Sequence, residues 1–252
     1  MRNKWKWLIP MVLLVILAGA FLIYTGNYYH ADASALDALG SDEAVTVTKT
    51  AYGWLFDGPS ETDALIFYPG AKVEETAYAP LLRRLAAEGM DVCLVRMPFR
   101  LAFLGLSKAD AVLAAHPYDR WYIGGHSLGG AMAASYAAGH ADRLTGVVLL
   151  AAYPTKALDD ALAVVTVYGS EDGVLNRAKL EKGRQYMPGS AREYVIEGGN
   201  HAQFGNYGRQ AGDGEAVLSA QEQQRRTVEA ILQSMIRTDE SNEGLLSPAG
   251  AV

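Results

Sequence analysis

Gly124-Gly125-His126-Ser127-Leu128-Gly129-Gly130 is the stretch of sequence that decides the fold. It lies between the apolar residues 121–123 and an alanine-rich segment that begins at Leu128. The G-x-S-x-G pattern is typical of a sharp turn from a strand into a helix, which exposes a serine hydroxyl at the carboxyl end of the strand. The free N–H groups and positive dipole end of the helix would lie beside that serine. We therefore predict Ser127 as a catalytic nucleophile; the alternative is a glycine-rich turn with an inert serine.

Short apolar runs alternate with segments of helical spacing on both sides of this turn. The predicted strands are residues 44–48, 64–68, 92–95, 121–123, 146–150, 162–168 and 193–196, and the predicted helices are residues 81–89, 108–115, 128–138, 177–186 and 221–236. Most of the strands are apolar on both faces, as strands are when helices cover both sides of a sheet. The pattern predicts an α/β fold with a doubly wound, mostly parallel sheet.

Composition limits the class of protein. Half of the 252 residues are hydrophobic, which is enough for one globular domain with a full core. The net charge is −6, and no basic run follows the N-terminus, so nucleic acid is not an expected partner. Cys93 is the single cysteine, so the fold has to be stable without an intramolecular disulfide.

The N-terminus has the pattern of a membrane segment. Residues 1–7 are basic and aromatic, and residues 8–24 are apolar without interruption. This length suits a membrane-spanning helix better than the shorter apolar core of a signal peptide. We predict an uncleaved single-pass anchor with a cytoplasmic N-terminus and an extracytoplasmic domain. The alternative is a secreted protein, produced by cleavage near residues 31–35, where small residues alternate as they do at processing sites.

These observations divide the chain into four parts. Residues 1–25 are predicted to be the membrane anchor or signal segment, and residues 26–40 a linker rich in small residues. Residues 41–238 are predicted to be the folded domain. Residues 239–252 lack periodicity and are predicted to be a disordered tail.

A serine hydroxyl needs a general base, and the order of residues along the chain selects one. Where a nucleophile sits on such a turn, the acid and then the histidine follow it in the sequence. Three of the five histidines precede Ser127, and His140 comes before any acid on a later strand. His201 remains; it lies in a glycine-containing loop just after the predicted strand 193–196. We predict His201 as the base, against the alternative of a histidine without a catalytic role.

The acid is expected on a turn after a strand that lies between those two residues. Tyr168-Gly169-Ser170-Glu171-Asp172-Gly173 directly follows the predicted strand 162–168. We predict that Asp172 accepts a hydrogen bond from the distal imidazole nitrogen and fixes its tautomer. Glu171 is the neighbouring alternative, whereas Asp159 and Asp160 have the pattern of solvated loop residues.

From about residue 64 to residue 236, the chain resembles the α/β-hydrolase superfamily, in particular its small lidless group related to dienelactone hydrolases. The stretch around Ser127, Gly169-Ser170-Glu171-Asp172 and Gly199-Asn200-His201 carry the resemblance. It implies backbone N–H groups of Ala71 and Leu128 as the oxyanion hole. The early loop reads Pro69-Gly70-Ala71, where many members carry His-Gly. Arg96 follows the strand 92–95 and is predicted to contact the substrate.

The sequence predicts a serine hydrolase that cleaves carboxylic esters through an acyl-enzyme, with a small-molecule ester as its substrate. A serine at the nucleophile position favours acyl hydrolysis over dienelactone or haloalkane chemistry. We expect no cofactor and no metal, because zinc-ligand spacing and phosphate-binding glycine loops are missing from the sequence. Acyl transfer to an alcohol or amine, and a binding protein that keeps the fold without catalysis, remain as alternatives. The sequence does not indicate an oligomeric state.

Overall fold

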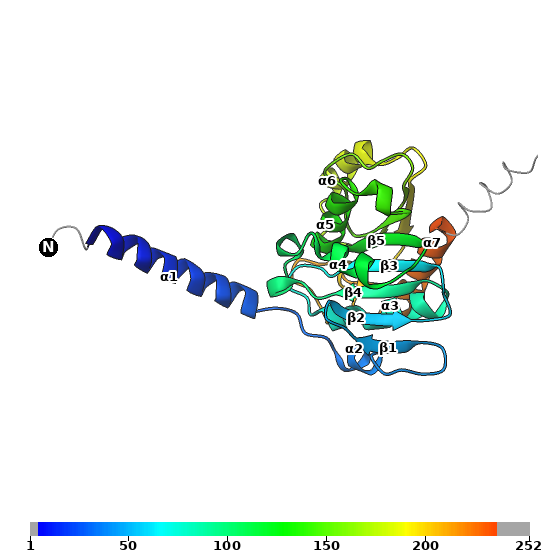
Figure 1. The fold of residues 1–252 in the computed structure, drawn as a ribbon, viewed down its shortest axis with the longest axis horizontal. Helices are drawn as coiled ribbons and strands as arrows, with labels where there is room; N and C mark the ends of the chain where they lie inside the picture. Colours follow the sequence, from blue (N-terminus) through cyan, green and yellow to red (C-terminus); the bar gives the residue numbers. More distant parts are fainter. Residues whose placement is uncertain (1–4, 236–252) are drawn as a thin grey trace, which may run out of the picture.

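The computed structural model describes residues 5–235, and these form one α/β domain preceded by a long N-terminal helix (Figure 1). The strands are β1 (Thr46–Lys49), β2 (Gly53–Asp57), β3 (Asp63–Tyr68), β4 (Asp91–Val95), β5 (Arg120–His126), β6 (Gly146–Leu150), β7 (Ala163–Gly169) and β8 (Arg192–Ile196). The α-helices are α1 (Trp5–Gly26), α2 (Ala33–Asp37), α3 (Ala79–Ala87), α4 (Lys108–Ala115), α5 (Leu128–Ala137), α6 (Arg177–Gly183) and α7 (Ala220–Met235). Every strand and helix predicted from the sequence is present, with ends shifted by a few residues.

Within residues 5–235 the strands form an eight-stranded sheet in the order β1-β2-β4-β3-β5-β6-β7-β8. From β4 to β8 all neighbours are parallel, whereas β2 runs antiparallel to both β1 and β4. The predicted doubly wound, mostly parallel sheet is therefore confirmed. Because the parallel strands share one direction, the loops after β3, β5, β7 and β8 all lie at one edge of the sheet, where ligands bind in such folds.

Helices cover both faces of the sheet, and alternate side chains of each strand pack on opposite sides. On one face, Leu65 and Phe67 of β3 pack in a core with α3 and α7. On the other face, Ala64 and Ile66 pack in a second core with α4 and α5. Cys93 of β4 is a free thiol buried in this second core, as its apolar neighbours predict. This burial on both faces is why the strands read as continuous apolar runs.

Strand β2 was not predicted from the sequence. Its residues Gly-Trp-Leu-Phe-Asp are neither strictly alternating nor continuously apolar, and their burial is mixed. Gly53 begins the strand where its backbone meets β4: an added Cβ would lie 2.1 Å from the carbonyl oxygen of Leu94. Glycine in a strand weakens the local signal even though this close approach requires it.

Helix α1 is 22 residues long and leaves the domain as an extended arm (Figure 1). Its segment Trp7–Gly26 is apolar, and most of its side chains are exposed. By length and composition this helix fits a single membrane-spanning helix, and a signal sequence near the N-terminus would fit the same description. The predicted tail at residues 239–252 lies outside the described residues.

The segment predicted as a linker, residues 26–40, is packed onto the domain in the structure. Tyr29 forms a parallel bridge with Val73, and the Asp32 N–H donates a hydrogen bond of 2.9 Å to the carbonyl oxygen of Asn206. Asp32 also caps the short helix α2, in which Ala35 is fully buried. Small residues indicated flexibility in the sequence, but here they allow close contact with the domain. The arm α1 is therefore joined to the domain by an ordered segment.

Candidate active site

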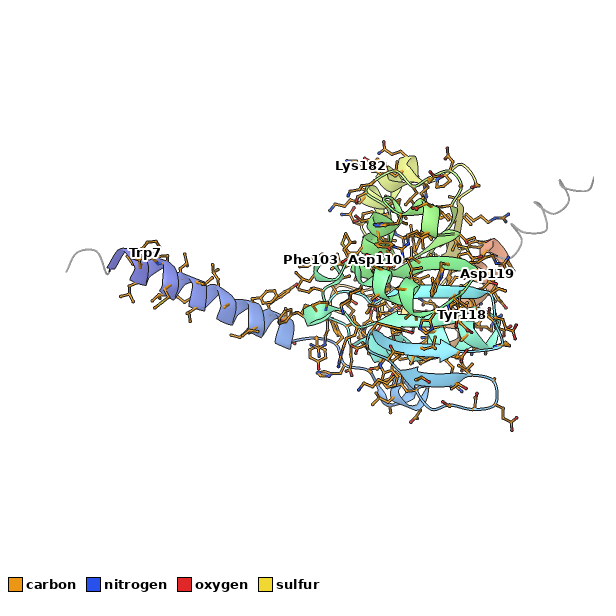
Figure 2. All side chains as sticks on the ribbon, viewed as in Figure 1. Trp7, Phe103, Asp110, Tyr118, Asp119 and Lys182 are labelled. Carbon is orange, nitrogen blue, oxygen red and sulfur yellow. The ribbon has the colours of Figure 1, made fainter. Side chains whose placement is uncertain are left out.

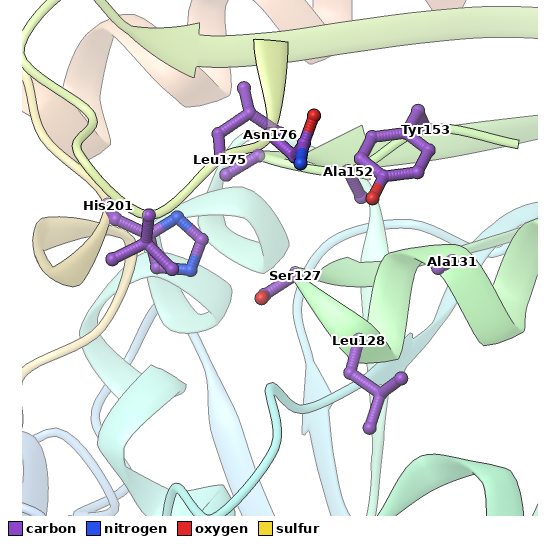
Figure 3. Close-up of a pocket in the computed structure, with 10 residues that line it drawn as sticks. Ser127, Leu128, Ala131, Ala152, Tyr153, Leu175, Asn176 and His201 are labelled. Carbon is purple, nitrogen blue, oxygen red and sulfur yellow. The ribbon is translucent and has the colours of Figure 1, made fainter. Parts of the chain in front are cut away.

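Ser127 lies on a sharp turn between β5 and α5 (Figure 3). Its φ and ψ are 52° and −121°, a backbone conformation that non-glycine residues rarely adopt. The chain can make this turn because glycines flank it: an added Cβ at Gly125 would lie 2.3 Å from the Tyr68 carbonyl oxygen, and one at Gly129 would lie 2.1 Å from the same atom. The glycines of the G-x-S-x-G pattern are thus required by the close approach of β3 to the turn.

His201 and Asp172 come together beside this turn, from the loops after β8 and β7. The Asp172 Oδ2 atom is 2.9 Å from His201 Nδ1, and both side chains are almost fully buried. The other carboxylate oxygen accepts hydrogen bonds from the backbone N–H groups of Val174 and Leu175, at 2.9 and 2.7 Å. An ionised carboxylate can only accept, so the ring proton lies on Nδ1 and the lone pair on Nε2. Nε2 has no hydrogen-bond partner among the described residues.

Two residues that the sequence reasoning missed hold the histidine loop in place. The Gln223 side chain of α7 accepts from the Asn200 N–H (2.9 Å) and donates to the Asn200 carbonyl oxygen (2.7 Å). The Asp213 carboxylate accepts from the N–H groups of His201 (3.2 Å) and Ala202 (2.8 Å). Gln223 is fully buried. Because a buried polar side chain needs hydrogen-bond partners, a glutamine on the buried face of α7 was the one feature of the sequence that could have indicated this role.

Ser127 and His201 line one cavity with a volume of about 220 Å³ (Figure 3). Small and apolar side chains form most of its wall, and the lining residues are Ser127, Leu128, Ala131, Ala151, Ala152, Tyr153, Val174, Leu175, Asn176 and His201. In Figure 3 the Ser127 hydroxyl and the His201 ring extend into the same space. The cavity can therefore hold a small apolar group next to a serine hydroxyl and a histidine nitrogen.

The two predicted oxyanion donors lie near this turn. Leu128 is the first residue of α5, where backbone N–H groups have no partner within the helix. Ala71 lies in the loop after β3, and its N–H has no acceptor among the described residues. This loop touches the turn, since an added Cβ at Gly129 would also meet the Pro69 carbonyl oxygen at 2.4 Å. Leu128 lines the cavity, whereas Ala71 does not.

A second buried histidine, His126, lies next to His201. The Gly70 N–H donates to the Tyr78 hydroxyl oxygen (3.0 Å), which lies 2.9 Å from His126 Nδ1. Because the tyrosine oxygen accepts from Gly70, its own proton is available for His126. The His126 ring packs against His201 with 4.4 Å between ring centroids. Burial, and then the neighbouring His201, lower the pKa of His126 well below its usual value, so His126 is neutral at physiological pH.

Arg96 does not reach the cavity. Its side chain is largely exposed and forms an ion pair with Glu75, with 3.0 Å between Nε and Oε1. Strand β4, which Arg96 follows, is separated from β5 by β3, so the residue lies two strands away from Ser127. The predicted substrate contact of Arg96 is therefore not brought about in this structure.

The site contains no candidate metal centre. Within residues 5–235, no group of three or more His, Cys, Asp or Glu side chains is placed to hold a metal ion. The polar side chains that line the cavity are those of Ser127, Tyr153, Asn176 and His201, and the Asp172 carboxylate lies behind His201.

The fold, with a serine on the turn after β5, defines the class of protein as an α/β hydrolase. Residues 64–225, more than half of the chain, match the model of the alpha/beta hydrolase family, and the protein belongs to that family. It is accordingly a hydrolase. None of the curated proteins matches the sequence.

Solved structures of hydrolases share the fold at low sequence identity. One is a predicted CIB-like hydrolase from Thermoplasma acidophilum, with a TM-score of 0.56 and 15% identity over 75% of this chain and 100% of the other. Another is a dienelactone hydrolase from Anabaena variabilis, with a TM-score of 0.53 and 15% identity over 78% of this chain and 99% of the other. The predicted resemblance to the superfamily is confirmed.

Proposed function

We propose that this hydrolase cleaves carboxylic esters by covalent catalysis, with Ser127 as nucleophile, His201 as general base and Asp172 as its orienting acid. The observation that carries the proposal is the buried hydrogen bond between Asp172 and His201 Nδ1, 2.9 Å long, beside a cavity that Ser127 also lines. This bond leaves the Nε2 lone pair free to take the serine proton. A carboxylate that holds the ring also stabilises the imidazolium formed during the reaction.

In the proposed reaction, the Ser127 oxygen attacks the ester carbonyl carbon while its proton passes to His201 Nε2. The N–H groups of Leu128 and Ala71 stabilise the tetrahedral oxyanion, an effect on the order of 3 kcal/mol per donor. The bond to the leaving alcohol then breaks, and the alcohol takes the proton from His201. Water, deprotonated by His201, then attacks the acyl carbon. The bond to Ser127 Oγ breaks, the acid leaves, and His201 returns the proton to the serine oxygen.

Labelling with a fluorophosphonate probe, together with hydrolysis of aryl esters, tests this proposal. We expect wild-type protein to be labelled once, and Ser127→Ala to lose both labelling and at least about a thousandfold in turnover while it stays folded. Ser190→Ala, a change at an exposed serine, is the matched control and keeps both properties. Turnover of Ser127→Ala close to wild type would contradict the assignment. A labelled protein that releases acid slowly, but forms a new ester when an alcohol is added, would be an acyltransferase.

We also propose that α1 anchors the protein in a membrane with the domain on the extracytoplasmic side. The support is the length and apolar composition of Trp7–Gly26, with Arg2, Lys4 and Lys6 before it. The expected result is that full-length protein stays with the membrane fraction after an alkaline carbonate wash. Recovery in the soluble fraction with an intact N-terminus would contradict the anchor.

A further inference from the structure

Exposed large apolar side chains are concentrated in one loop of the domain. The loop, residues 98–106, follows β4 and contains the short 3-10 helices η2 (Pro98–Arg100) and η3 (Ala102–Leu104). Its exposed apolar members are Phe99 (48% exposed), Phe103 (53%), Leu104 (45%) and Leu106 (36%). In the rest of the described chain after α1, exposed large apolar residues occur singly, at Leu36, Val195 and Val217. Single residues of this kind need no explanation, but a cluster indicates a binding surface.

The loop is held in place by the structure. The Tyr68 hydroxyl donates to the Leu106 carbonyl oxygen (2.7 Å) and accepts from the Ala109 N–H (3.0 Å). Phe99 and Arg100 have φ values of 51° and 59°, which side-chain-bearing residues rarely adopt. The Arg100 carbonyl oxygen accepts from the N–H of Lys72 in the neighbouring loop, at 3.0 Å. These contacts hold the backbone of the loop in place, and its apolar side chains are exposed.

The C-terminal end of α1, where the helix meets the domain, contacts the same loop. The Phe21 and Phe99 rings are 5.1 Å apart between centroids, in an edge-to-face arrangement. The Arg100 guanidinium lies 3.2 Å from the centre of the Tyr28 ring. Close by, Lys72 Nζ lies 4.3 Å from the centre of the Tyr24 ring. Apolar tips beside aromatic rings and cations are the composition that the headgroup region of a bilayer favours, because the rings and cations lie at the level of the phosphates.

The loop also lies at the catalytic edge of the sheet. The helix η3 packs against α5, the helix that begins after Ser127. In Figure 2 Phe103 lies on the side of the domain from which α1 extends, whereas Asp119 lies on the opposite side. The end of α1 and the carboxyl ends of the parallel strands are therefore on the same side of the molecule.

We propose that residues 98–106 lie in the lipid headgroup region of the bilayer that α1 spans, and that the Ser127 cavity opens beside the membrane surface. The anchor alone would leave the domain free to turn, whereas this second contact fixes its orientation. The apolar side chains enter the interface, and Lys72 and Arg100 lie at the level of the lipid phosphates. The proposal requires α1 to span the bilayer; it does not depend on which acyl group the site cleaves.

Fluorescence of the full-length protein in phosphatidylcholine and phosphatidylglycerol vesicles tests the proposal. Phe103→Cys carries an environment-sensitive nitrobenzoxadiazole dye, and Asp119→Cys on the opposite side is the matched control; Leu104→Cys is a second position in the loop. Native Cys93 is fully buried, so unchanged protein measures the labelling background. Lipids that carry a nitroxide close to the headgroup quench a dye only when it lies in the interface.

We expect the dye at positions 103 and 104 to emit at shorter wavelength on vesicles and to be quenched at least about twofold more than the dye at position 119. Equal, water-like emission at positions 103, 104 and 119 would overturn the proposal. A dye at position 103 that is shielded but not quenched by the nitroxide lipids would also overturn it, and would favour contact with a second copy of the chain. Failure of the full-length protein to float with the vesicles would overturn it as well. The experiment measures dye fluorescence and not ester turnover, so its result does not depend on whether the esterase proposal is correct.

Discussion

Asp172 and Glu171 are neighbours in the chain but have different surroundings. The Asp172 side chain is fully buried and accepts one hydrogen bond from His201 and two from backbone N–H groups. Glu171 is exposed, and its carboxylate accepts a hydrogen bond from Ser170. The sequence could not separate these two acids, because the choice depends on how the turn after β7 directs each side chain. The structure favours Asp172 as the partner of His201.

Exchange of each acid for its amide is predicted to have very unequal effects. Asp172→Asn presents an amide to His201 Nδ1 and favours the wrong tautomer, so turnover falls on the order of 10³- to 10⁴-fold. Glu171→Gln, the matched control, changes turnover less than about threefold, since its side chain faces solvent. Steady-state kinetics on an aryl ester, with circular dichroism to check folding, measures both. A larger loss in Glu171→Gln would make Glu171 the acid.

Tyr78 illustrates a site residue that sequence reasoning could not find. Its hydroxyl joins Gly70, in the loop after β3, to His126, the last residue of β5, which lies 48 positions away in the chain. Tyr78→Phe leaves the buried Gly70 N–H and His126 Nδ1 without a partner. We expect kcat to fall about tenfold with little change in KM, because the loop that carries Ala71 loses its fixed position.

Fluorophosphonate labelling supplies the control for this variant. Tyr78→Phe keeps Ser127, His201 and Asp172, so it should still be labelled to completion, only more slowly. Tyr207→Phe is a matched change at a neighbouring buried tyrosine whose hydroxyl donates to Gln210 and not to the histidines. Equal losses in the two variants would mean that Tyr78 acts only through stability.

At the level of the elements, the turn from β5 into α5 has room only for glycine at positions 125 and 129, on either side of Ser127. An added Cβ at Gly129 would lie 2.1 Å from the Tyr68 carbonyl oxygen and 2.4 Å from that of Pro69. Both are backbone atoms, which cannot move aside easily. Gly129→Ala is therefore predicted to destabilise the domain by about 1–3 kcal/mol and to abolish most activity by displacing Ser127. Gly139→Ala, just after α5, meets its nearest atom at 3.8 Å and should keep both stability and activity. Thermal melting and ester turnover of the two variants give the comparison.

The parts of the fold that the sequence predicts are those in which burial and periodicity agree. Strands β3 and β4 are buried on both faces and read as unbroken apolar runs. Strand β2 was missed, and the segment at residues 26–40 was interpreted as a linker. The position of β2 depends on its pairing with β4, and that of residues 26–40 on contacts with Val73 and Asn206. Local composition contains no information about such partners.

At the scale of the whole molecule, no cap domain is inserted between β6 and β7, the connection next to the cavity. Residues 151–162, which connect β6 and β7 and are all described, contain no helix or strand. A connection this short has no room for a cap domain, so we expect an open site that only loops cover. The cavity next to Ser127 has a volume of about 220 Å³, which is enough for a small group.

The size of this cavity predicts a preference for short acyl groups. Each methylene buried against the apolar wall contributes about 0.8 kcal/mol, or about fourfold in kcat/KM, until the chain leaves the cavity. We therefore expect kcat/KM on aryl esters to peak between acetyl and butyryl and to decline beyond hexanoyl, without a jump above the critical micelle concentration. Ala131→Leu puts a larger side chain in the cavity wall, so the cavity becomes smaller and the preferred acyl length should move towards acetyl. An optimum at decanoyl or longer would mean that the acyl chain lies elsewhere, in a site that extends towards the bilayer.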